Sequence, residues 1–309
     1  MAMRGGPSTG LPTKTEQGDL FQALGASQGD FPKIIFSPRS VEECFAITIE
    51  SFNLSDKYQC PVVILTDLYL AESLQTVDGV DIKHIPLDRG PLLERVDNGS
   101  YRRFADTETG VSPRVLPGTP GACYVSATDE HDEDGIVISD VFTNPAVRVK
   151  MMDNRMRKMN GILKELPKPA IEGPADADLT LVGWGSTYSL LKETILALNS
   201  QGLKINLLSL RNLWPFQDEE VAQILRGCKT TLSVEANYTG QLVQLIRMRT
   251  GILIQHHLRK YDGEPFTPRD VIELARKIVT EKPKQSIVAT VVTDEGLPKD
   301  FSPVAAAHV

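Results

Sequence analysis

The residues best suited to chemistry lie at the start of the chain. Over residues 4–13, Arg4 is followed by glycines, prolines and hydroxyl side chains. A guanidinium holds a carboxylate through two parallel hydrogen bonds, and glycines let backbone N–H groups approach an anion closely. This composition predicts an anion-binding loop, with a plain surface loop or an expression remnant as the alternative. The candidate anion-binding residues are Arg4, Gly5, Gly6, Ser8, Thr9 and Thr13.

A second glycine-containing segment, residues 183–187, directly follows an apolar run. It begins like the turn of a nicotinamide dinucleotide fold, but the third glycine of that motif is missing. No acidic residue ends the next apolar run near Ile205 either. The segment therefore favours a tight turn from strand to helix, capped by Ser186 or Thr187, over a cofactor site.

Two charged segments of opposite sign lie between these regions. Residues 129–134 are acidic around His131, but they lack the ordered spacing and central glycine of a calcium loop. They favour a solvated charge cluster over a metal site. The other segment is a basic helix face, which could bind phosphate or an acidic partner, although most such faces are simply solvated. Its residues are Arg148, Lys150, Arg155, Arg157 and Lys158.

Composition limits the class of protein. The chain has 309 residues, of which 41% are hydrophobic, and this predicts two ordinary domains. A formal net charge of −7 argues against a nucleic-acid partner. No apolar run approaches the ~20 residues that span a bilayer. The cysteines Cys44, Cys60, Cys123 and Cys228 are scattered, so we expect reduced core thiols in a soluble cytoplasmic protein, with no metal site.

The order of predicted elements in the first half indicates an α/β fold. Residues 34–36 are the first strand, residues 41–54 a helix that begins with a capping box at residues 40–43, and residues 62–67 a buried parallel strand. Asp67 ends that strand, at the position where α/β sheets place ligand-contacting groups.

The first predicted domain, residues 1–166, contains a long excursion at residues 81–135. Prolines and glycines interrupt its periodicity, which is typical of a functional loop or linker. Residues 144–166 follow as the helix with the basic face. Residues 167–178 are rich in proline, alanine and acidic residues, and we assign them to a linker between domains.

The second predicted domain, residues 179–285, alternates strands and helices with short connections. This order predicts a doubly wound parallel sheet. Residues 286–309 are assigned to a tail, of which residues 302–309 are expected to be disordered. The predicted strands are residues 179–185 (with the turn), 205–209 and 230–235, and the predicted helices are residues 187–199, 217–226, 238–250 and 267–280.

Several motifs occur in a fixed order along nearly the whole chain. They are residues 4–13, 16–19, 29–32, 66–73, 116–121, 129–133 and 234–242. Together they resemble the α subunit of 2-oxoacid:acceptor (ferredoxin) oxidoreductases, especially the 2-oxoglutarate type.

This resemblance implies thiamine diphosphate chemistry. Such enzymes decarboxylate a 2-oxoacid oxidatively, transfer the acyl group to coenzyme A, and pass electrons through iron–sulfur clusters to ferredoxin. By resemblance, residues 1–166 are the carboxy-terminal part of a pyrimidine-binding domain, and residues 179–285 resemble the transketolase carboxy-terminal domain. Arg4 matches the arginine that binds the substrate carboxylate. Ser8, Thr9 and Thr13 are the further substrate-binding candidates.

The chain also departs from the family pattern. The upstream Ile-Thr-Pro loop and the glutamate that activates the cofactor are absent from it. We therefore expect an α subunit lacking its amino-terminal part, inactive alone, with no catalytic residue, metal ligand or cofactor of its own. Mg²⁺ and the clusters would lie in a β subunit or other domains, so the implied partners are the β subunit, an amino-terminal or γ portion, and ferredoxin. A non-catalytic assembly module whose second domain docks a partner, and a nicotinamide dehydrogenase, are the alternatives.

Overall fold

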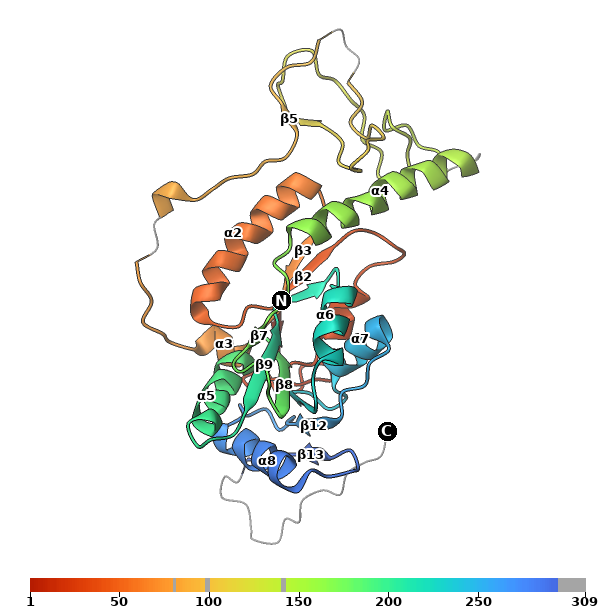
Figure 1. Cartoon of the computed structure of the whole chain (residues 1–309). Helices are drawn as coiled ribbons and strands as arrows, with labels where there is room; N and C mark the ends of the chain where they lie inside the picture. The colour runs from red at the N-terminus through yellow and green to blue at the C-terminus, as the bar shows by residue number, and fades with distance from the viewer. Residues whose placement is uncertain (80–81, 98–100, 140–142, 294–309) are drawn as a thin grey trace.

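A computed structural model describes residues 1–79, 82–97, 101–139 and 143–293 of the chain (Figure 1). The expected disorder of residues 302–309 concerns residues outside these ranges. Two packed regions lie one above the other in the figure, and a long excursion extends from the upper region. No helix in the described ranges is both long enough and apolar enough to cross a membrane.

The carboxy-terminal region is built on a six-stranded sheet with the order β13-β12-β11-β8-β9-β7. All neighbouring pairs are parallel except β7 and β9, which are antiparallel. The strands are β7 (Ile171–Glu172), β8 (Leu179–Trp184), β9 (Ile205–Leu210), β11 (Thr231–Glu235), β12 (His256–Arg259) and β13 (Val288–Thr290).

Helices cover both faces of this sheet, as the apolar runs predict. α5 (Thr187–Asn199) and α8 (Pro268–Glu281) pack on one face, where their apolar residues meet Leu181 and Leu232. α6 (Asp218–Arg226) and α7 (Gln241–Thr250) pack on the other face against Val182. The predicted doubly wound parallel sheet is thus confirmed. β7 and β13 lie in segments that we assigned to the linker and the tail; as short edge strands they leave little periodic signal.

The amino-terminal region has a smaller sheet, in which β2 (Ile34–Phe36) lies between β3 (Val62–Ile64) and β10 (Asn212–Trp214). β10 comes from the second half of the chain, so the two halves share this sheet. α2 (Val41–Tyr58) and α4 (Pro145–Glu165) contribute Ile47 and Ile162 to its core. The Ser40 hydroxyl caps α2 by accepting from the backbone of Glu43 at 3.1 Å. The Glu43 carboxylate accepts from Arg39 N–H, so the predicted capping box is only half formed.

The prediction that the first strand begins at Ile34 is wrong. β1 (Ala2–Met3) pairs in parallel with β4 (Thr66–Asp67), and Met3 is buried. A two-residue ladder has no periodicity to detect. Other short elements are α1 (Leu20–Leu24), α3 (Leu68–Glu72), a 3₁₀ turn (Ile82–His84), β5 (Leu92–Leu93) and β6 (Arg114–Val115).

The sequence led us to expect that the acidic run and the basic helix face are each solvated. This expectation is wrong, because the two segments form ion pairs with each other. Glu130 forms ion pairs with Arg148 and Arg155, and Glu133 forms one with Lys150. The excursion therefore folds back onto α4 through opposite charges. All four cysteines are free, but only Cys60 is buried. Cys44 and Cys228 are partly buried and Cys123 is exposed, so the expectation of core thiols holds only for Cys60.

Candidate functional site

Segment 15–19, directly after the glycine-rich loop, packs against the carboxyl end of β11. The Gln17 side chain is fully buried. Its Nε2 donates to the Trp184 carbonyl at 2.8 Å, and its Oε1 accepts from the backbone of Ala236 at 3.0 Å. The Gln17 backbone donates to the Ala236 carbonyl at 2.6 Å and accepts from the Asn237 amide at 3.2 Å. Two motifs from opposite halves of the chain thus form one hydrogen-bonded unit.

Glu235 is the acceptor at the centre of this unit. Its fully buried carboxylate accepts from the backbone of Leu242 at 2.8 Å and of Val243 at 3.2 Å, in the first turn of α7. The Asn237 amide and the Trp184 indole donate to it at 3.1 and 3.4 Å. Burial raises the pKa of this carboxyl, while the four hydrogen bonds act in the opposite direction. Glu235 therefore joins β11, α7 and β8.

Asp67 joins the two regions of the molecule. It is almost completely buried, it caps α3 by accepting from Leu70 N–H at 2.9 Å, and it also accepts from the Ser186 hydroxyl. Burial raises its pKa, and hydrogen bonds from Ser186, Leu70 and Thr15 partly oppose that rise. The predicted ligand-contacting role of Asp67 is thus corrected, because its carboxylate oxygens are committed to contacts within the protein.

The turn before α5 is also a packing feature. The predicted tight turn places Ser186 at the N-cap position of α5, but its side chain makes no capping hydrogen bond and instead donates to Asp67. Thr187 Oγ1 donates back to the Trp184 carbonyl at 2.8 Å. A Cβ atom on Gly185 would lie 2.6 Å from Ser37 Oγ, so side chains of the protein fill the space beside this turn. This packing disfavours a dinucleotide at the turn.

The glycine-rich loop, residues 4–13, projects from this anchored base. Leu11 N–H donates to the Gly5 carbonyl at 2.8 Å and closes the loop. Gly10 has a φ of +51°, and a Cβ atom there would lie 1.9 Å from that carbonyl, so the closure requires glycine. Arg4 is exposed and forms no hydrogen bond or ion pair with any residue that the structure describes. The other predicted site residues, Ser8, Thr9 and Thr13, are exposed on the same loop.

An acidic pair lies at the base of the loop. Glu16 is half-buried, and a Cβ atom on Gly5 would lie 2.6 Å from its carboxylate, so this carboxylate sits close under the loop. Burial, together with repulsion from Asp19 and Asp262, raises the pKa of Glu16 to about 7. Burial also raises the pKa of Asp19, which the charge of Arg4 partly offsets. Sequence alone did not indicate this pKa shift, because its largest cause is the burial of Glu16 in the folded chain, and a smaller one is Asp262 from a distant segment.

The arrangement places an exposed guanidinium and hydroxyl donors on one loop whose base is fixed, and these groups have the chemistry that suits an anion. The loop offers no comparable acceptor set for a cation. Within the described ranges, no group of three or more His, Cys, Asp or Glu side chains is placed to hold a metal ion.

Two family models match the chain. Residues 1–152 match the family described as pyruvate flavodoxin/ferredoxin oxidoreductase, thiamine diphosphate-binding. Residues 177–271 match the family described as pyruvate:ferredoxin oxidoreductase core domain II. The first match ends within α4, and the second begins just before β8.

Individual relatives agree with these matches. The α subunit of 2-oxoacid:ferredoxin oxidoreductase 1 from Sulfurisphaera tokodaii is 33% identical over 93% of this chain and 45% of its own length. The 2-oxoglutarate oxidoreductase subunit KorA from Mycobacterium tuberculosis is 33% identical over 87% of this chain and 40% of its own length. A solved 2-oxoglutarate:ferredoxin oxidoreductase from Magnetococcus marinus, with 2-oxoglutarate, coenzyme A and succinyl-CoA bound, superposes with a TM-score of 0.83. It is 34% identical, over 90% of this chain and 48% of that one. The chain thus spans about half the length of these relatives.

Proposed function

The chain belongs to the 2-oxoacid:ferredoxin oxidoreductase α-subunit family, and we propose that it supplies the substrate-carboxylate site of such an enzyme. The observation that carries this proposal is Arg4, an exposed guanidinium that has no carboxylate within 4.0 Å among the described residues, although its charge acts on Asp19 nearby. It stands on a loop fixed from below by the Gln17–Glu235 unit. A fixed cation orients a 2-oxoacid by its carboxylate and leaves the neighbouring carbonyl free to react.

The proposed reaction is the oxidative decarboxylation of a 2-oxoacid, with 2-oxoglutarate as the substrate. Its acyl group would pass to coenzyme A, and its electrons through iron–sulfur clusters to ferredoxin. The support comes from the names of the relatives and from the ligands bound to the Magnetococcus marinus enzyme. In this scheme Arg4 holds the substrate carboxylate, and Ser8, Thr9 and Thr13 offer hydroxyl donors beside it.

The thiamine diphosphate implied by the family would supply the carbanion that attacks the substrate carbonyl. The described residues do not fit the Mg²⁺ that accompanies its diphosphate, because no cluster of carboxylates or histidines among them is placed to hold a metal ion. The loop donors suit a carboxylate instead. We therefore propose that the cofactor and clusters are held by a β subunit and further domains, and we derive no step through them on this chain.

The test is the substitution Arg4→Ala in the complete complex, assembled with its β subunit and remaining domains. We expect the KM for 2-oxoglutarate to rise on the order of 10²-fold, because a bidentate charged contact is lost, and Arg4→Lys to restore part of it. Arg226→Ala is the matched control, since Arg226 is also exposed and has no partner among the described residues. An unchanged KM in Arg4→Ala would leave the chain as an assembly module that does not bind substrate.

A further inference from the structure

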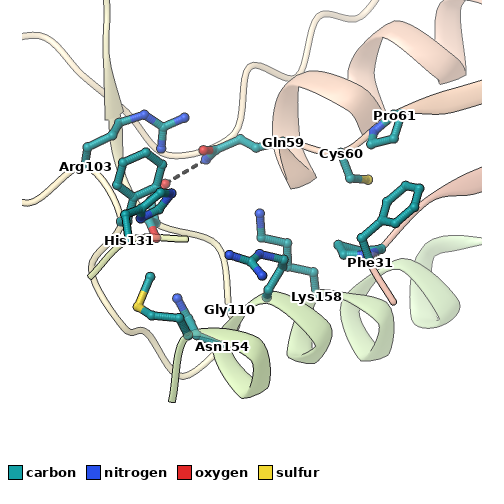
Figure 2. A pocket seen from close by; sticks show the side chains of 14 residues that line it. Phe31, Gln59, Cys60, Pro61, Arg103, Gly110, His131, Asn154 and Lys158 are labelled. Carbon is teal, nitrogen blue, oxygen red and sulfur yellow. Dashed lines mark hydrogen bonds between the residues drawn. The ribbon is translucent and has the colours of Figure 1, made fainter. Parts of the chain in front are cut away.

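A cavity of about 270 Å³ lies between α4, the excursion and the segments beside β2 and β3 (Figure 2). It shares no residue with the loop over residues 4–13. Three cationic side chains, Arg103, Arg155 and Lys158, line it together with apolar and aromatic residues. Figure 2 shows the Lys158 ammonium group and the Arg103 guanidinium pointing into the cavity, one from α4 and the other from the excursion.

The cationic side chains of α4 differ in whether they form an ion pair with a carboxylate. Outside the cavity, Lys150 pairs with Glu133, and Arg157 pairs with Asp106 at 3.0 Å. At its rim, Arg155 pairs with Glu130 at 3.0 Å. Lys158, one turn further along the same helix, has no carboxylate within 4.0 Å among the described residues.

Arg103 is in the same situation, since its guanidinium lies over the Phe104 ring at 5.1 Å and has no carboxylate partner in the part of the chain that the structure describes. Its neighbour Arg102, outside the cavity, pairs with Glu133 at 2.8 Å. Acidic groups are thus present nearby, but they pair with other cations, one of which, Arg155, also lines the cavity. Two positive charges inside it are left uncompensated.

This arrangement carries an electrostatic cost. Burial, together with repulsion from Arg103 and Arg155, lowers the pKa of Lys158 to about 8. The Cys60 thiol does not neutralise the ammonium, because burial raises the pKa of Cys60 to about 11 and keeps it protonated. A bound anion would remove both the repulsion and the cost of partly burying an unpaired cation.

We propose that this cavity binds a phosphorylated small molecule, with the phosphoryl group between Lys158 and Arg103. A phosphate monoester carries a charge of about −1.5 to −2 at pH 7, which matches the two uncompensated cations better than a single carboxylate does. The volume exceeds that of a phosphate ion alone. Phe31 lines one end, and the other end holds Phe104 stacked on His131, with ring centroids 3.9 Å apart, so aromatic surface is available to the organic part.

The experiment measures binding to the full chain by calorimetry at 150 mM salt, with pyrophosphate, adenosine monophosphate and coenzyme A as probes. If the ligand is a free nucleotide, we expect adenosine monophosphate to bind. If the phosphoryl group belongs to a longer cosubstrate, we expect only coenzyme A to bind. In either case Lys158→Gln and Arg103→Gln should each weaken Kd at least ~10-fold. Lys150→Gln, on the same helix but paired outside the cavity, should not.

A second measurement separates loss of binding from loss of folding. Because Lys158 is unpaired and partly buried, Lys158→Gln should raise the thermal midpoint of the ligand-free chain by a few degrees. Whichever of the three probes binds the wild type should raise its thermal midpoint, and Lys158→Gln should abolish this rise. The proposal is overturned if no probe binds the wild type more tightly than Lys158→Gln, whatever the midpoint. This result would not bear on Arg4, which lies on a different loop.

Discussion

The amino-terminal motif contains two adjacent segments with opposite environments. Residues 4–13 are mostly exposed, and Arg4, Ser8, Thr9 and Thr13 form no hydrogen bonds with described residues. Residues 15–19 are hydrogen-bonded to β8, β11 and the start of α7 through Gln17 and its partners. The first segment therefore has donors to offer a ligand, whereas the second has used its own within the chain.

This difference bears on the proposed role of the surface loop. A loop with few internal contacts belongs to the least stable part of a fold, and a ligand that bound it would have to order it. The buried Gln17–Glu235 unit reduces the cost of ordering the loop, because it fixes the segment that directly follows residues 4–13. The comparison predicts that changes in the buried unit affect stability, whereas changes in the loop affect binding.

Glu235→Leu should have the largest effect on stability. The substitution leaves two backbone N–H groups, the Asn237 amide and the Trp184 indole without their acceptor in the interior. We expect the free energy of unfolding to fall by about 4 kcal/mol, measured by urea denaturation. Glu219→Gln, at an exposed position in the first turn of α6, is the control. Similar losses in the two variants would show that Glu235 is not the centre of a network.

The long elements that carry this unit were predictable from sequence, but the unit was not. β8 and α5 follow from a continuous apolar run and from helical spacing, which are local signals. Gln17 and Glu235 lie in opposite halves of the chain, and nothing local indicates that Gln17 hydrogen-bonds to the residue after Glu235. The two motifs were recognised only through the family resemblance, each by itself.

Long-range contacts explain the other errors as well. The acidic run and the basic face of α4 were interpreted as two solvated surfaces, since sequence does not show that the excursion folds back onto the helix. Asp67 was placed correctly at the end of a strand, but its partner Ser186 belongs to the other region. The role of the exposed loop residues stays a prediction, and it could be made from sequence because their chemistry does not depend on a partner within the chain.

Glu16 lies between the exposed and the buried segment, and its titration should make stability depend on pH. Its pKa is raised from 4.5 to about 7, so the fold favours the protonated form. This contribution is fully present below about pH 4.5 and is lost as the pH rises through 7. Glu16→Gln should therefore become more stable relative to the wild type between pH 5 and pH 8, by about 1–2 kcal/mol once solvent screening is allowed for. Urea denaturation at both pH values measures this, and a difference that is the same at pH 5 and pH 8 would contradict it.

The smallest expected effect on stability is in the loop. Thr9→Ala and Thr13→Ala remove exposed hydroxyl groups that have no hydrogen bond to the described residues, so the free energy of unfolding should stay within about 0.5 kcal/mol of the wild type. In the complete complex the same variants should raise the KM for 2-oxoglutarate, but by less than Arg4→Ala does, because a neutral hydrogen bond is weaker than a charged one. A stability loss as large as that of Glu235→Leu would place the loop in the same structural unit as its base. The distinction between a fixed base and a ligand-binding loop would then fail, and with it the reason to assign the substrate to Arg4.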